Sequence, residues 1–160
     1  MANRTRTDNV DLVPAAEPAS RAYERDFYTW SQEQARLVRE GRWDAVDREN
    51  VAEEIESLGR TEFAKLESAL RVLLVHILKW DHQPQRRSKS WIISIKDQRI
   101  AFERVLQDNP GLKSRQDEVL VRAYERARLQ AAEQTGLDED RFPETCAYSW
   151  DDIAGRSFSL

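Results

Sequence analysis

The sequence contains little cysteine, glycine, proline or histidine. Its one cysteine, Cys146, cannot form a disulfide within the chain, and the amino terminus has no charged segment followed by an apolar signal core. These features predict a protein of the reducing cytoplasm. The 5 glycines and 5 prolines, together with 34% charged residues, favour helices with heavily charged outer faces.

Long hydrophobic runs are also missing. The longest apolar stretch, Val72 to Leu78, is interrupted by His76 and is far shorter than the roughly 20 residues that a membrane span requires. We therefore expect no transmembrane segment. The formal net charge of -4 means that any binding of nucleic acid would have to be local.

Hydrophobic periodicity predicts an all-α fold. Residues 1–20 show no periodicity, so we expect a flexible N-terminal arm, followed by a single helical domain over residues 21–160. The expected fold is an antiparallel helical bundle of about five helices with a short C-terminal latch. The helix that follows Thr61 is apolar on most sides, which places it at the centre of the bundle.

Local start and stop signals define the expected helices. The first begins near Tyr23 and stops at Gly41, the second runs from a cap at Asp44 to Gly59, and the third follows a cap at Thr61. The fourth follows a cap at Ser90 and breaks at 109–111, and the fifth runs from Ser114 to Gly136. Residues 142–146 form the latch, and Ser149 begins a last short turn.

Several strings of the sequence resemble one known family. They are Tyr-Glu-Arg-Asp-Phe-Tyr-Thr-Trp at 23–30, Glu-Asn-Val-Ala-Glu-Glu-Ile-Glu-Ser-Leu-Gly at 49–59, His-Ile-Leu-Lys-Trp at 76–80, Gln-Pro at 83–84, Ser-Trp at 90–91 and Phe-Pro-Glu-Thr-Cys at 142–146. In this order they resemble the bacterial family called domain of unknown function 29. The resemblance implies a soluble, helical bacterial protein and supplies no catalytic residues.

The acidic residues of the second expected helix form the first candidate site. Glu54 and Asp47 lie beside the apolar stripe of Val51, Ile55 and Leu58, near the core boundary. Such carboxylates suit a hard cation or general acid and base chemistry. They equally suit an ion pair, and Arg99, which falls within the apolar stripe of the fourth helix, is the candidate partner for Glu54.

His76 forms the second candidate. A neutral imidazole in an apolar helical turn can act as a ligand or a base, or it can be a core residue whose nitrogens are satisfied. The spacing of Arg71 and His76 resembles the motif of helical ribonucleases in the higher-eukaryote-and-prokaryote nucleotide-binding superfamily, in which arginine would hold phosphate. Five positions apart on a helix, however, the two side chains diverge by about 140°.

A basic loop forms the third candidate. Arg86, Arg87 and Lys89 lie between Trp80 and Trp91 at the expected end of the third helix. Guanidinium groups and indoles can hold phosphates and stack on bases, but cations are also favoured at a helix C-terminus and both tryptophans fit apolar stripes. The loop is the only local concentration of positive charge in an acidic chain.

The sequence therefore favours a non-enzymatic interaction module. We expect Arg86, Arg87 and Lys89 to contact a partner protein or another anionic partner, with nucleic acid as a weaker possibility. The alternative is a ribonuclease or other nuclease that uses Arg71, His76 and Glu54. We expect no cofactor and no bound metal, and Cys146 has no basic neighbour in the sequence that would activate its thiol.

Overall fold

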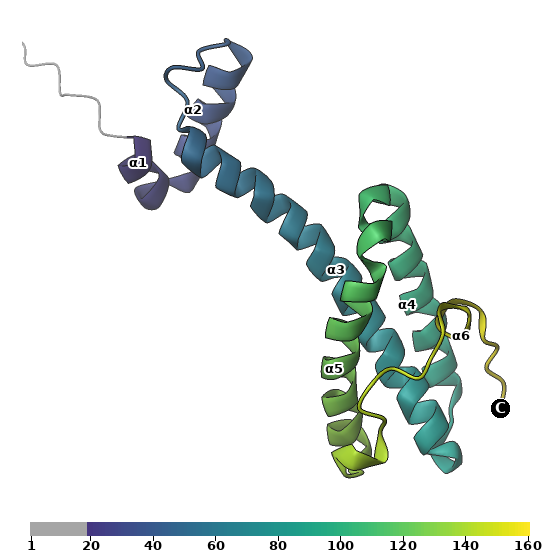
Figure 1. Ribbon diagram of the computed structural model, residues 1–160. Helices are drawn as coiled ribbons and strands as arrows, with labels where there is room; N and C mark the ends of the chain where they lie inside the picture. The colour runs from purple at the N-terminus through teal and green to yellow at the C-terminus, as the bar shows by residue number, and fades with distance from the viewer. Residues whose placement is uncertain (1–18) are drawn as a thin grey trace, which may run out of the picture. The chain divides into compact units, whose positions relative to one another are not determined.

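The computed structural model describes residues 19–160, which form two compact units, one ending at Glu56 and the other spanning Ser57–Leu160. The described residues contain helices and no strand, which confirms the all-α prediction. The helices are α1 (Ala19–Arg25), α2 (Phe27–Arg39), α3 (Arg48–His82), α4 (Lys89–Asp108), α5 (Gln116–Thr135) and α6 (Trp150–Gly155), with short 3₁₀ turns η1 (Pro84–Arg86), η2 (Pro110–Arg115) and η3 (Glu139–Arg141) (Figure 1).

Two expectations concern residues at the edges of this description. The predicted flexible arm, residues 1–20, lies outside the described residues except for positions 19 and 20, which belong to α1. The prediction of a single domain over residues 21–160 stays a prediction. Within residues 19–160, no helix combines the length and the apolar character that crossing a membrane demands.

Residues 19–39 form two helices, α1 and α2, where the sequence predicts one. Asp26 interrupts the helix, since its backbone leaves the helical region and its carboxylate accepts a 3.0 Å hydrogen bond from the Thr29 amide. An aspartate at this position satisfies an amide that the helix start leaves without a partner. The predicted stop at Gly41 is close to the end of α2, and Gly41 has a φ of 70°, which favours glycine.

A small buried set holds the N-terminal unit together. Trp30 and Leu37 of α2 are buried, and the Trp30 indole donates to the Asp47 carboxylate at 3.2 Å. The buried Gln34 side chain accepts a 2.8 Å hydrogen bond from the Asp47 amide. These bonds tie α2 to the segment that enters α3.

The predicted break between the second and third helices is wrong. α3 is continuous from Arg48 to His82, and both Gly59 and Thr61 lie inside it. Gly59 has no positive φ, and the Thr61 hydroxyl donates to the Ser57 carbonyl at 2.9 Å, as helical Ser and Thr side chains commonly do. A glycine within a helix costs only about 1 kcal/mol, which the neighbouring helix-forming residues offset.

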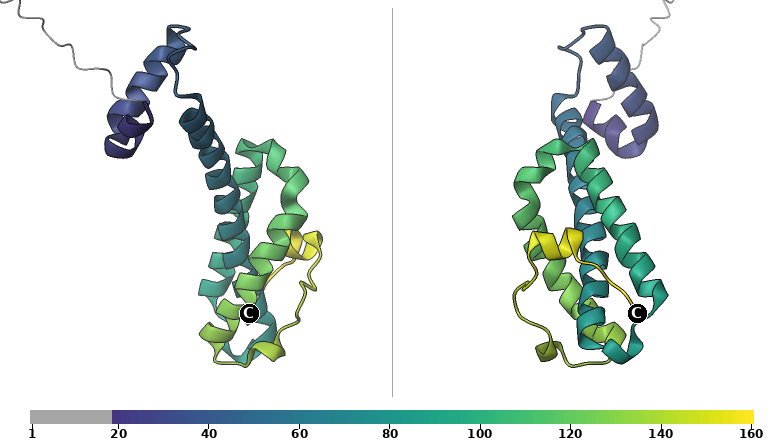
Figure 2. Two further views of the ribbon diagram at one scale, coloured as in Figure 1. Left: turned by 60° about the vertical axis from the view of Figure 1, so that its left-hand side comes forward. Right: turned by 90° about the vertical axis from the view of Figure 1, so that its right-hand side faces the viewer.

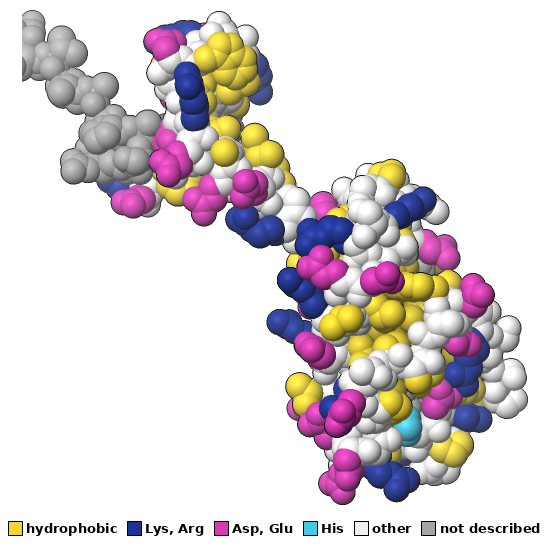
Figure 3. Space-filling view, in the orientation of Figure 1, with side chains coloured by type: hydrophobic (Ala, Val, Ile, Leu, Met, Phe, Trp, Pro, Cys, Tyr) yellow, Lys and Arg dark blue, Asp and Glu magenta, His cyan; other side chains and the backbone are white. Residues whose placement is uncertain are grey.

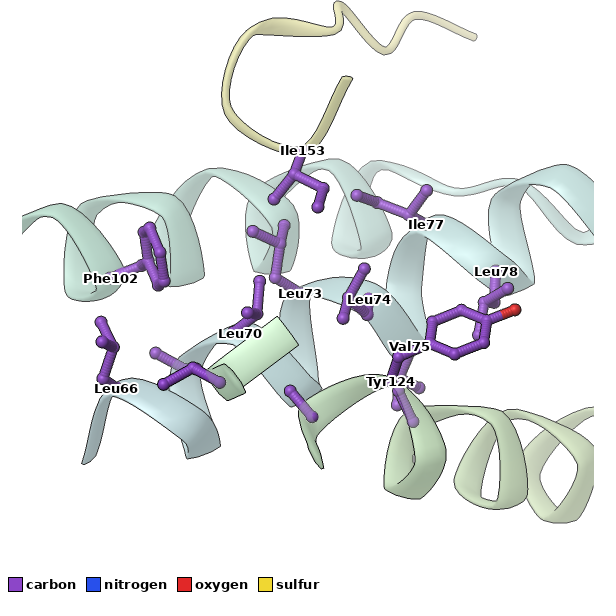
Figure 4. Packing of buried hydrophobic residues seen from close by; sticks show 14 of the residues in the cluster. Leu66, Leu70, Leu73, Leu74, Val75, Ile77, Leu78, Phe102, Tyr124 and Ile153 are labelled. Atoms are coloured by element: carbon purple, nitrogen blue, oxygen red, sulfur yellow. The ribbon is translucent and has the colours of Figure 1, made fainter. Parts of the chain in front are cut away.

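The Ser57–Leu160 unit is a three-helix bundle built around the C-terminal half of α3. In Figures 1 and 2 the chain runs along α3, returns along α4 and runs forward again along α5, so α4 is antiparallel to both of its neighbours. Figure 4 shows side chains of α3 meeting Phe102 of α4, Tyr124 of α5 and Ile153 of α6. The side chains of α3 that are at most 1% exposed are Leu66, Leu70, Leu73, Leu74, Val75, Ile77 and Leu78, so the prediction of a central helix is confirmed.

Two predicted helix starts are displaced by a few residues. α4 begins at Lys89 after Ser88, so Ser90 is already helical, and its hydroxyl lies 2.8 Å from that of Ser88. Ser114 belongs to η2, where its hydroxyl donates to the Gly111 carbonyl, and α5 starts at Gln116. The predicted ends at Asn109 and Gly136 are correct, and Gly136 has a left-handed φ of 69°.

Residues 142–158 pack along the bundle and include the predicted latch at 142–146, so the whole segment is called the latch from here on. Phe142 and Ile153 are buried, and the Tyr124 hydroxyl of α5 donates to the Pro143 carbonyl at 2.8 Å. Ser149 begins α6 as predicted, because its hydroxyl and the Asp152 carboxylate cap each other's backbone amides. The latch therefore completes the core in addition to covering it (Figure 2).

Truncation of a central α3 side chain tests this core. We expect Leu74→Ala to lower the free energy of unfolding by about 2–5 kcal/mol, because Leu74 is fully buried and its loss leaves a cavity. Leu129→Ala is the matched control, since Leu129 is 56% exposed and should cost less than about 0.5 kcal/mol. Denaturant unfolding measures both values, and equal losses would contradict the central position of α3.

Gly59 provides a second test because it lies inside α3. A Cβ added there meets no atom within 4 Å, and the backbone has no positive φ. Gly59→Ala should therefore raise the free energy of unfolding by about 0.5–1 kcal/mol, since alanine loses less conformational entropy in a helix. A destabilised variant in the same denaturant assay would mean that Gly59 ends a helix, as the sequence suggests.

Candidate functional site

The turn between α3 and α4 presents the predicted basic residues on a fixed backbone. α3 ends at His82, and the buried Gln83 side chain donates to the Thr135 carbonyl at 3.0 Å, which ties the turn to the end of α5. Pro84 opens η1, whose short 3₁₀ turn holds Arg86. The three cations therefore project from a backbone that is anchored to the bundle.

The Arg87 side chain bonds to its own chain, so it supports the fold more than it is available to a partner. Its guanidinium donates to the Trp80 carbonyl at 3.0 Å and stacks 4.9 Å from the centre of the Trp80 ring. A cation that satisfies a carbonyl in the last turn of a helix also interacts favourably with the helix dipole. Of the three predicted contact residues, Arg87 is thus the one with a structural role.

Arg86 and Lys89 are exposed, and neither forms an ion pair with any acidic residue in the described part of the chain. Many other basic side chains do have acidic partners. Arg36 bonds to Glu33 and Glu40, for example, and Arg128 pairs with Glu139 at 2.7 Å. The α3–α4 turn therefore keeps a positive charge that its own surroundings do not neutralise.

Lys79 adds a cation that the sequence reading missed. Its ammonium lies 4.7 Å from the centre of the Trp91 ring and donates to the Gln134 side chain at 2.9 Å. Burial lowers the Lys79 pKa, and the positive charge of Arg86 lowers it further. Lys79 of α3 lies over Trp91 of α4, so it adds positive charge at the ends of the two helices that the turn joins. The position of Lys79 in the last turn of α3, seven residues before Arg86, was the available signal.

Asp81, the acidic residue closest to Arg86 along the sequence, already has hydrogen-bond partners. Its carboxylate accepts bonds from both terminal nitrogens of Arg156, at 2.6 and 2.8 Å, and from the Tyr148 hydroxyl at 2.9 Å. Burial alone would raise the Asp81 pKa, but the bonds from Arg156 and Tyr148 outweigh it, so the pKa lies below its ordinary value. Asp81 therefore fastens the latch and leaves the basic turn without a counter-ion.

The predicted pairing of Glu54 with Arg99 is wrong. Glu54 accepts a 2.5 Å hydrogen bond from the Tyr23 hydroxyl, and this bond raises the Tyr23 pKa to about 12. Arg99 donates instead to the carbonyls at the end of α6, those of Asp152, Ile153 and Arg156. A guanidinium at a helix C-terminus donates to the last carbonyls of the helix, and these bonds offset the cost of partly burying Arg99.

Arg71 and His76, the candidates for a nuclease, have separate surroundings. Arg71 bonds to Gln130 of α5 and to Ser68, and it lines a shallow groove with Ala64, Glu67 and Arg126 that does not include His76. His76 Nδ1 lies 2.8 Å from the Val72 carbonyl, and burial lowers the His76 pKa. The half-buried imidazole is thus bonded within its own helix.

Two further chemical roles, a metal site and a reactive cysteine, also lack support among the described residues. Among residues 19–160, no three His, Cys, Asp or Glu side chains are grouped so that they could hold a metal ion. Cys146 is half-buried, and burial raises the pKa of its thiol, which disfavours the reactive thiolate.

The chain matches the family model described as Domain of unknown function DUF29 over residues 22–159, nearly its whole length. The chain belongs to this family. The match covers the α3–α4 turn, the latch and both partners of the Asp81–Arg156 pair, so the candidate site lies entirely within the family's domain. No curated protein and no solved structure matches the chain.

The Asp81–Arg156 pair predicts a pH-dependent stability. Because the folded-state pKa of Asp81 is depressed, its contribution is complete above the ordinary carboxyl pKa of about 3.9 and is lost as the pH falls through the lower folded-state value. Asp81→Asn should reduce the free energy of unfolding by about 1–3 kcal/mol near neutral pH. The difference between wild type and variant should shrink below about pH 4 in denaturant titrations, and a constant difference would contradict the ionic pairing.

Proposed function

We propose that this DUF29 chain is a non-enzymatic interaction module of the bacterial cytoplasm, and that the α3–α4 turn contacts an acidic surface of a partner protein. Arg86 and Lys89 make the direct contacts. Lys79 adds to the positive charge, and Arg87 holds the turn in place. The single cysteine agrees with a reducing compartment.

One observation carries this proposal: the turn holds exposed cations without acidic partners on a backbone anchored by Gln83 and Arg87. A fixed backbone lowers the entropy that binding must overcome. Uncompensated charge attracts an oppositely charged surface and raises the rate of association. An acidic protein surface fits better than nucleic acid, because Trp80 is buried and the Lys79 ammonium lies over the Trp91 ring, which reduces the indole surface that bases could stack on.

The nuclease alternative has less support in the geometry. A mechanism with arginine on phosphate and histidine as proton carrier needs both groups at one substrate. Arg71 instead bonds to Gln130 and Ser68, while His76 bonds within α3. If purified protein cleaves RNA and His76→Ala abolishes the cleavage, the nuclease reading replaces the interaction module.

Charge reversal at the turn tests the proposed contact. The double variant Arg86→Glu/Lys89→Glu should bind a fluorescein-labelled oligoglutamate peptide at least about tenfold more weakly than wild type in anisotropy titrations at low salt. Arg87 is left unchanged, because its bonds to Trp80 support the fold.

The matched control is Arg104→Glu/Lys113→Glu, which makes the same change in net charge at exposed sites on α4 and η2. This control should stay within about twofold of wild type, since the site and not the total charge binds the peptide. Equal weakening in both double variants would show a general charge effect and refute a specific site. Tighter binding of a single-stranded RNA than of oligoglutamate would assign the turn to nucleic acid instead.

A further inference from the structure

The end of the latch lies against the C-terminal end of α3. Phe158 is half-buried and packs on the hydrophobic core, and its ring meets the ring of Trp80 edge to face, with 5.4 Å between the ring centres. Trp80 itself is buried near the end of α3. In Figures 1 and 2 the last residues of the chain run beside the ends of α3 and α4 that the basic turn joins. The latch therefore reaches the base of the proposed binding site.

Two guanidinium groups lie over the Phe158 ring. Arg156 is 5.0 Å and Arg99 5.4 Å from the ring centre, and a cation over an aromatic face is attracted to its negative potential. Both cations are themselves fixed, since Arg156 bonds to the Asp81 carboxylate and Arg99 to carbonyls at the end of α6. Lys and Arg side chains are visible on this side of the larger unit in Figure 3. These contacts give the Phe158 ring a defined position.

The Trp80 ring connects Phe158 to the α3–α4 turn. The Arg87 guanidinium lies 4.9 Å from the centre of the same ring and donates to the Trp80 carbonyl. Within the turn, the Arg87 amide reaches the Pro84 carbonyl only at 3.4 Å, which is longer than an ordinary hydrogen bond. The contacts of the Arg87 side chain with Trp80 therefore support a turn whose own backbone bond is weak at this position.

We propose that Phe158 is a positioning residue for the α3–α4 turn. The end of the latch fixes the Trp80 ring, this ring fixes Arg87, and Arg87 keeps the turn in the conformation that presents Arg86 and Lys89. The effect on binding rests on the function proposed above, because a preformed site loses less entropy when a partner binds. The latch thereby sets the affinity of the turn, and Phe158 does so without adding a charge to it.

Hydrogen exchange of the free, full-length protein tests the positioning. The amides of Arg86 and Arg87 both donate within the turn. Phe158→Ala should speed their exchange at least about fivefold, because the Trp80 ring loses a neighbour and holds Arg87 less firmly. Phe158→Tyr should exchange like wild type, since it keeps the aromatic ring.

Phe63→Ala is the matched control. Phe63 of α3 also has two guanidinium groups over its ring, those of Arg115 at 4.5 Å and Arg122 at 5.3 Å, and it is buried. Its loss should therefore affect the stability of the bundle at least as much, while exchange at Arg86 and Arg87 stays within about twofold of wild type. Phe63→Leu replaces this control if circular dichroism shows that the alanine variant loses its helices.

Binding of the labelled oligoglutamate peptide tests the consequence. Phe158→Ala should weaken binding about three- to tenfold, whereas Phe158→Tyr and Phe63→Ala should stay within about twofold of wild type. The salt dependence of the Phe158→Ala affinity should match that of wild type, because no charge is removed. Arg86→Glu/Lys89→Glu should change that dependence, since it reverses charges at the contact.

The outcomes separate this proposal from the function on which it rests. Unchanged exchange in Phe158→Ala, or equal acceleration in Phe158→Ala and Phe63→Ala, would overturn the positioning role. Faster exchange with unchanged affinity would refute the effect on binding and leave the function proposed for the turn intact. If wild-type protein does not bind oligoglutamate, that function fails, and the exchange rates still decide whether Phe158 holds the turn.

Discussion

Removal of the C-terminal half of α3 from water is the interaction on which the larger unit depends. Leucine, isoleucine and valine side chains cover most of this helix, and α4, α5 and the latch each bury part of it. Because burial of apolar area is the main favourable term in folding, none of these elements can be lost without exposing α3. Phe142 and Ile153 show that the latch belongs to the same core.

Packing around α3 also determines which hydrogen-bond partners the nearby polar groups have. Asp81, Gln83 and Arg87 lie at the end of the helix or just after it, and each bonds to a group that holds the turn or the latch. Arg99 similarly satisfies the end of α6. Arg86 and Lys89 project from this anchored turn without an acidic partner, which is why the binding role proposed above is placed at the turn.

Elements with strong local signals were predictable from sequence. The wide apolar stripe identifies α3 as central, and Gly136 and Ser149 are correctly read as a helix end and a cap. Gly59 and Thr61 misled the prediction, because a glycine and a threonine can also lie within a helix when the residues on both sides favour it. Ile55 and Leu58 also form an apolar stripe, yet both are exposed, since periodicity shows which face is apolar but not what covers it.

The sequence by itself determined the helical class, the central helix, the family and the position of the basic turn, because each depends on residues that are neighbours along the chain. Only the tertiary structure decided which cations remain available. Arg87 and Trp80 are seven positions apart, but Asp81 and Arg156 are separated by 75, and Arg99 meets carbonyls more than 50 positions away. Such partners are set by packing, so no local pattern could show that Asp81 is occupied while Arg86 and Lys89 are not.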